Sequence, residues 1–139
     1  MADLAPLIRV RKHDIEQKQK TLAELYRQAE ALKDQRDALE TQLAIEAEKT
    51  KDMGEEMLGF FEPYAISTRA QVEKIDGDRQ KMESIIKMAQ NDMRDAFAEL
   101  KKIEIIDERR AEEALAALDK KDADELDEIA IDAFRRDED

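Results

Sequence analysis

The sequence contains no cysteine, no tryptophan, one histidine, three glycines and two prolines among 139 residues. Without cysteine the chain can form neither a disulfide nor a thiolate metal site. The scarcity of glycine and proline argues against a sheet protein, which needs many turn-forming residues. A single histidine and the lack of a glycine-rich phosphate loop leave no pattern typical of catalysis. We therefore predict that the protein is not an enzyme and has no catalytic residue, metal site or cofactor.

Long apolar runs are also missing from the sequence. No stretch approaches the roughly 20 apolar residues that a membrane-spanning helix requires. The opening segment, MADLAPLIRVRK, lacks the apolar centre of a signal peptide. We expect a cytoplasmic protein that does not insert directly into a membrane.

Charge is abundant, and it is unevenly distributed along the chain. Charged residues make up 43% of the sequence, and the formal net charge is −12. Residues 104–139 hold 15 acidic and 6 basic side chains, whereas residues 1–36 hold 6 acidic and 8 basic ones. Phosphate binding requires a basic stripe. The distribution therefore argues against nucleic acid as a partner, including the role of a tRNA-binding helical arm.

Apolar residues recur at alternating spacings of three and four along two long segments. This spacing, in a chain rich in Ala, Glu, Lys, Leu and Arg, is the signature of a coiled coil. We define the seam as the helix face that carries these positions. The first series comprises Leu4, Ile8, Arg11, Ile15, Lys18, Leu22, Leu25, Ala29, Leu32, Arg36, Leu39, Leu43, Glu46, Thr50, Met53, Met57 and Phe60. The second comprises Ala65, Thr68, Val72, Ile75, Arg79, Met82, Ile86, Ala89, Met93, Ala96, Leu100 and Ile103.

The two series are separated by the segment Gly59–Tyr64. Gly59 can end a helix in a left-handed conformation, and Pro63 can begin the next helix. We therefore predict an all-α fold, a long antiparallel two-helix coiled-coil hairpin in one domain spanning residues 1–139. The first helix is expected at about 6–58, the turn at 59–64 and the second helix at about 65–134. A hairpin centred near residue 61 places Leu118 opposite Leu4 and leaves about 20 residues as a C-terminal helical overhang.

Several positions admit two interpretations. The seam also carries polar residues, which either weaken it locally and fix its register or, in the case of the long lysine and arginine side chains, cover the seam with their aliphatic stems while their charges stay in water. These residues are Arg11, Lys18, Arg36, Glu46 and Thr50. The aromatic residues Phe60, Phe61 and Tyr64 either plug the end of the hairpin or form an exposed tip that a partner contacts. The overhang, which is amphipathic and lacks a partner helix, should bind another molecule or fray.

Three segments of the chain resemble the FliJ family, a small soluble component of the flagellar type III export apparatus. They are LIRVRKHDIEQKQKTLAEL near the start, AFAELKKIEIIDERR in the second helix and LDEIAIDAFRRDED at the end. The ending contains the acidic pair Asp127-Glu128 followed by small apolar residues. The resemblance extends over nearly the whole chain, and the second segment looks most like alphaproteobacterial forms.

This resemblance implies a non-catalytic stalk that binds the hexameric export ATPase and promotes its assembly. It also implies contact with the cytoplasmic domain of the export gate and a link to export chaperones. Polar Thr68 and the acidic overhang both depart from the family pattern. For the ATPase, the resemblance points to Ile8, Arg11, Ile15, Leu118, Leu126, Ile129 and Phe134. For the gate, it points to Thr68, Val72, Ile75 and Arg79.

Two other functions fit the same pattern. One is the equivalent stalk of a virulence-type III secretion system, and the other is a structural coiled-coil hairpin that acts as an adaptor for an unknown partner. A coiled coil that self-associates in parallel would not need a glycine and proline break in the middle of the chain.

Overall fold

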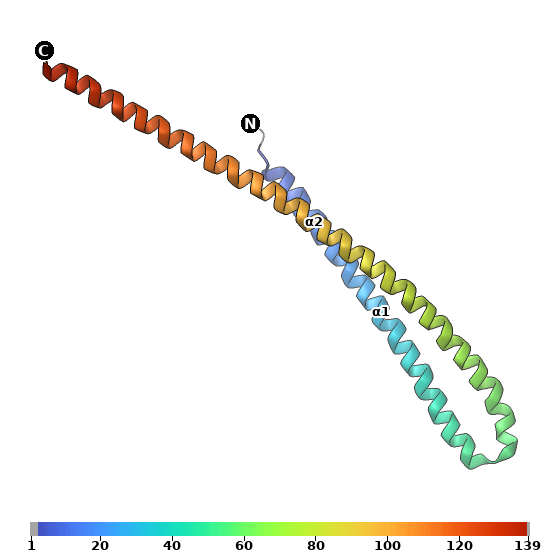
Figure 1. Cartoon of the computed structure of the whole chain (residues 1–139). Helices are drawn as coiled ribbons and strands as arrows, with labels where there is room; N and C mark the ends of the chain where they lie inside the picture. Colours follow the sequence, from blue (N-terminus) through green and yellow to red (C-terminus); the bar gives the residue numbers. More distant parts are fainter. Residues whose placement is uncertain (1–2, 139) are drawn as a thin grey trace. The chain divides into compact units, whose positions relative to one another are not determined.

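The computed structural model describes residues 3–138, which form two long helices. Helix α1 spans Ala5–Met53 and helix α2 spans Glu55–Glu138, with Gly54 between them (Figure 1). No strand occurs within residues 3–138, which confirms the predicted all-α class. Within the same range, no helix combines the length and the apolar character needed to cross a membrane.

Helix α1 begins with a local cap. The carboxylate of Asp3 accepts a hydrogen bond of 3.0 Å from the backbone N–H of Ala5. The carbonyl of Leu4 accepts one of 2.9 Å from the N–H of Ile8. Pro6 lies in this first turn, where its missing N–H costs nothing because that donor would have no helical partner. The helix begins at Ala5, next to the residue at which the sequence predicts its start.

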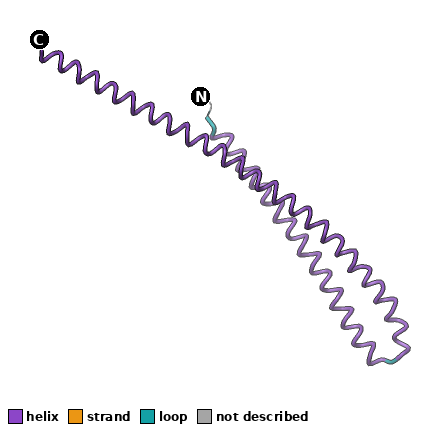
Figure 2. Tube along the Cα trace, in the orientation of Figure 1, coloured by secondary structure: helices purple, strands orange, loops and turns teal. Residues whose placement is uncertain are grey.

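The turn lies earlier than predicted. Gly54 has a φ of 89°, and residues 59–64 are helical, with Pro63 inside α2 (Figure 2). The prediction of a turn at 59–64, with helices ending at 58 and beginning at 65, was wrong. Gly54 provides the left-handed conformation that ends α1, and α2 starts at once with Glu55 and Glu56 in its first turn, where acidic side chains are favourable.

Residues Asp14–Asp95 form one compact unit in which α1 and α2 pack antiparallel on either side of Gly54. The pairs Arg36–Asp76 and Tyr26–Gln90 join the two helices. The midpoint between Arg36 and Asp76 is residue 56, not residue 61. Ile15, Thr50, Ala65 and Thr68 are buried. The other predicted seam positions of this unit are partly covered, except Met53, Met57 and Phe60, which are exposed because they follow or adjoin the turn.

The second unit contains the described residues before Asp14 and after Asp95. Leu100 is buried, while Leu4, Ile8, Arg11 and Ile103 are half-buried. From residue 105 to residue 138 every side chain is exposed, although the backbone stays helical. We call these residues the C-terminal segment. It is longer than the expected overhang, because the earlier turn also ends the seam earlier on α2, and its helix continues past the predicted end at 134. The expectation of a single domain stays a prediction.

Candidate protein-contact surfaces

A charged cluster crosses the seam near its middle. The guanidinium of Arg36 donates a hydrogen bond of 2.5 Å from Nε to Asp76 Oδ1, and its Nη1 forms an ion pair with Glu40 Oε2 at 3.0 Å. Arg79 Nη1 lies 3.8 Å from the same oxygen of Asp76. These contacts join α1 to α2, so the structure favours the interpretation in which Arg36 fixes the register of the helices.

The electrostatics of this cluster follow from its geometry. The pKa of Arg36 is raised, chiefly by its hydrogen bond to Asp76 and further by the negative charges of Asp76 and Glu40. The cation is therefore held firmly in its charged form, and it cannot act as a proton donor or base at ordinary pH. The cluster is suited to positioning the two helices rather than to chemistry.

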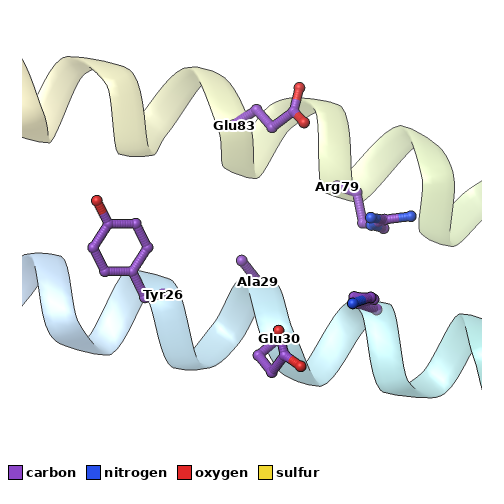
Figure 3. Close-up of a pocket in the computed structure, with 6 residues that line it drawn as sticks. Tyr26, Ala29, Glu30, Arg79 and Glu83 are labelled. Atoms are coloured by element: carbon purple, nitrogen blue, oxygen red, sulfur yellow. The ribbon is translucent and has the colours of Figure 1, made fainter.

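An open groove of about 280 Å³ lies beside the seam within the Asp14–Asp95 unit. Tyr26, Ala29 and Glu30 line it from α1, and Arg79 and Glu83 line it from α2 (Figure 3). The Tyr26 hydroxyl accepts a hydrogen bond of 2.7 Å from Gln90 Nε2. The groove presents charged groups of both signs to solvent, from Glu30, Lys33, Arg79 and Glu83. A desolvated reaction site needs a deeper enclosure than this groove offers.

The predicted tip residues behave differently from one another. Phe60 is 72% exposed. Phe61 is half-buried, and its ring centroid lies 6.3 Å from that of Tyr64. Met57 and Thr50 line a small pocket of about 150 Å³ together with these rings. Phe61 and Tyr64 therefore pack on each other, as the plug interpretation expects, while Phe60 remains open to solvent, as the tip interpretation expects.

The four residues predicted to contact the gate lie on the seam side of α2. Thr68 is only 3% exposed, and Val72, Ile75 and Arg79 are half-buried. The aliphatic members face the packed side of the hairpin. Arg79 is the most accessible of the set, with 39% of its side chain exposed. A partner that contacts this stretch without separating the helices would reach Arg79 rather than Thr68.

The residues predicted to contact the ATPase fall into two groups. Of the three at the start of α1, Ile15 is buried and Ile8 and Arg11 are half-buried. The four in the C-terminal segment are all more than half exposed: Leu118, Leu126, Ile129 and Phe134. The structure therefore exposes the C-terminal group and covers much of the N-terminal group.

Four large aliphatic residues of the C-terminal segment share one side of α2. An α-helix turns by about 100° per residue, so residues 11 positions apart nearly superimpose. Leu115 and Leu126 are one such pair, and Leu118 and Ile129 are the other. We call these four residues the overhang face. Ile131 lies about 180° from the centre of this face, and Phe134 lies about 120° from it.

Sequence reasoning overlooked Asp76 and Tyr26. Asp76 adjoins the seam residue Ile75, and an acidic residue beside the seam is a reasonable partner for a seam arginine. Finding that pair requires the register, which depends on the turn, and the predicted turn was misplaced. No group of three or more His, Cys, Asp or Glu residues within 3–138 is arranged to hold a metal ion.

Comparison with known proteins gives one match. A family model described as "Flagellar FliJ protein" matches residues 1–139. No curated protein matches the chain. No solved structure matches it either.

Proposed function

The chain belongs to the flagellar FliJ family, and we propose that it is a non-catalytic stalk of the flagellar type III export apparatus. In this role it binds the hexameric export ATPase, promotes assembly of the ATPase ring and contacts the cytoplasmic domain of the export gate. Its place would be in the cytoplasm, at the base of the export apparatus. The family description favours the flagellar system over a virulence-type system.

The observation that carries the ATPase contact is the exposed C-terminal segment. Its large aliphatic side chains from Leu115 onward are all more than half exposed, so the rest of the chain covers little of their surface. Contiguous apolar surface on a helix that lacks a packing partner marks an interaction site. An amphipathic helix binds by laying its apolar side into a groove of the partner. Leu118, Leu126 and Ile129 would enter such a groove.

The N-terminal residues would support this contact rather than make most of it. Ile8 and Arg11 are half-buried and Ile15 is buried. These side chains are therefore less accessible to a partner than those of the C-terminal group. Phe134 lies about 120° from the centre of the overhang face, so it would meet the partner at the edge of the groove rather than inside it.

The gate contact is proposed for the start of α2, at Thr68, Val72, Ile75 and Arg79. Arg79 would make the direct contact, because its side chain is the most exposed of the four. The exposed Phe60 nearby would add apolar area. Replacement of Arg79 with Ala should weaken retention on the immobilised gate domain, whereas Arg94→Ala, at an exposed position elsewhere on α2, should not. Export chaperones are a further class of partner that this surface would accept.

The ATPase contact is tested by measuring ATP hydrolysis of the purified export ATPase with the full chain and with a truncation after Ala117. The full chain should bind the ATPase and raise ring-dependent hydrolysis, while the truncation should do neither. A truncation that stimulates hydrolysis as well as the full chain would contradict the assignment of the contact to the C-terminal segment. If neither chain binds, the protein is better described as a structural hairpin adaptor.

Point variants separate the overhang face from the rest of the segment. Ile129→Glu places a charge on the face and should reduce stimulation by at least about tenfold, because a carboxylate is costly to desolvate. Ile131→Glu introduces the same charge two residues away on the opposite side of the helix, where 51% of the isoleucine is exposed. It serves as the matched control and should stimulate hydrolysis like the unmodified chain. Equal loss in both variants would mean that charge, and not the face, controls binding.

A further inference from the structure

The overhang face is symmetric about Asp122. Leu115 and Ile129 lie seven residues on either side of Asp122, and Leu118 and Leu126 lie four residues on either side. Asp122 itself points in the same direction as the centre of the face, at 100° per residue. The order of apolar residues is therefore nearly the same read in either direction along the helix.

Such a surface is what a two-fold symmetric contact requires. In an isologous interface the same patch on both copies meets itself, so residue i of one copy contacts residue j of the other and the reverse. When two copies of α2 lie antiparallel with their Asp122 residues at the same height, Leu115 of one lies level with Ile129 of the other. Leu118 of one then lies level with Leu126 of the other. All four residues are at least 55% exposed in the single chain.

From this symmetry we propose that the C-terminal segment binds a second copy of this chain, as an antiparallel helix pair centred on Asp122. The pairing covers the overhang face of both copies. It goes beyond the proposed role in export and does not depend on it, and a chain paired in this way cannot present the same face to the ATPase at the same time.

Charges beside the overhang face favour the antiparallel arrangement on one flank. Lys121 and Glu125 lie on the same flank of the helix. In the antiparallel pair, Lys121 of one copy and Glu125 of the other differ in position along the helix axis by only about 3 Å. Asp107 and Arg136 meet in the same way at the two ends of the contact. Two-fold symmetry repeats each pair, so four attractive pairs border the interface. Charge pairs of this kind set partner choice and orientation in coiled coils.

Other charges limit the strength of the pairing. Asp122 of one copy lies opposite Asp122 of the other. On the second flank, Glu108 of one copy lies level with Asp137 of the other, so these acidic pairs repel. The C-terminal segment carries 13 acidic and 6 basic residues, so the two copies also repel each other over a longer range. The association should therefore be weak and reversible, and it should strengthen when Asp122 is replaced with Asn.

Sedimentation equilibrium of the full chain over a range of concentrations tests the proposal. The expected result is a reversible monomer–dimer equilibrium. Leu126→Glu should weaken it by at least about tenfold, whereas Ile131→Glu, on the opposite side of the helix, should change it by less than about twofold. The proposal is overturned if the chain is monomeric at every concentration or if both variants weaken the dimer equally.

Cysteine cross-linking tests the orientation, and it does so cleanly because the natural chain has no cysteine. In the antiparallel pair the two copies of residue 122 are adjacent, while the two copies of residue 133 are about 33 Å apart. A disulfide needs Cα atoms within about 7 Å of each other. Asp122→Cys should therefore form a dimer under oxidation and Ala133→Cys should not. Cross-linking of both variants would indicate a parallel pair, and cross-linking of neither would indicate no pair, so either outcome overturns the proposal.

Discussion

Replacing each glycine in turn with alanine should have opposite effects on stability at different positions. Gly54 has a φ of 89°, a conformation that L-residues rarely adopt. Gly59 and Gly77 lie inside α2 with helical backbone, and a Cβ added at either would meet no atom within 4 Å. The same chemical change therefore introduces strain at Gly54 and only restricts the unfolded chain at the other two positions.

The magnitudes follow from backbone preferences. Gly54→Ala should lower the free energy of unfolding by about 1–2 kcal/mol, the cost of a left-handed conformation for a residue with a Cβ. Gly59→Ala and Gly77→Ala should each raise it by about 0.5–1 kcal/mol, because alanine is the better helix former. Gly54→Ala and either helical variant should thus differ by about 2 kcal/mol.

Urea unfolding followed by circular dichroism at the helix band measures these differences directly. The reasoning is refuted if Gly54→Ala is neutral or stabilising. It is also refuted if Gly59→Ala is destabilising by more than about 1 kcal/mol, because that result would place the left-handed turn residue at Gly59. Gly77→Ala is the internal control, since it lies far from either turn position.

Three further predictions concern packing, pH and backbone. Ile15 is only 5% exposed, so Ile15→Ala should lower the free energy of unfolding by about 2–4 kcal/mol. Leu118 is 55% exposed, so Leu118→Ala should change the free energy of unfolding by less than about 0.5 kcal/mol. Urea unfolding measures both. The pKa of Glu24 is lowered from its ordinary value of 4.5, chiefly by its hydrogen bond to Arg27. The ionised pair therefore stabilises the fold at pH values above 4.5, and this stabilisation is lost as the pH falls through the lowered pKa of the folded chain. The difference in melting temperature between the unmodified chain and Glu24→Gln should accordingly vanish in acid. Pro63→Ala should raise the melting temperature, because proline inside a helix leaves the carbonyl four residues earlier without its donor and costs up to about 3 kcal/mol; an unchanged melting temperature would show that the surrounding helix already accommodates the ring.

The position of the turn illustrates why the register could not be predicted locally. Gly54 and the Gly59/Pro63 segment are both plausible breaks when each is considered alone. A hairpin centred near residue 61 would place Arg36 opposite Ile86, which offers no partner for a guanidinium. The observed turn instead brings Arg36 to Asp76, and the small residues Ala65 and Thr68 are buried. Long-range pairing therefore selects between two breaks that local preferences leave open.

The predicted contact residues were affected by the same uncertainty. Leu126, Ile129 and Phe134 are exposed because the C-terminal segment has no packing partner, and this was expected of an overhang. Leu118 was expected opposite Leu4 and is 55% exposed instead, because the earlier turn ends the seam before that residue. Thr68 was predicted to contact a partner, but it is buried between the helices.

The sequence by itself determined the all-α class and most of the side chains that share each seam, though not Met53, Met57 and Phe60, which are exposed around or just after the turn. Those properties depend on the 100° rotation between successive residues, which acts within a few residues of each position. Only the tertiary structure decided where the chain reverses, which residues of the two helices meet, and that residues 105–138 are exposed. Those properties depend on pairing between residues distant in sequence, such as Arg36 with Asp76, which local turn preference does not specify.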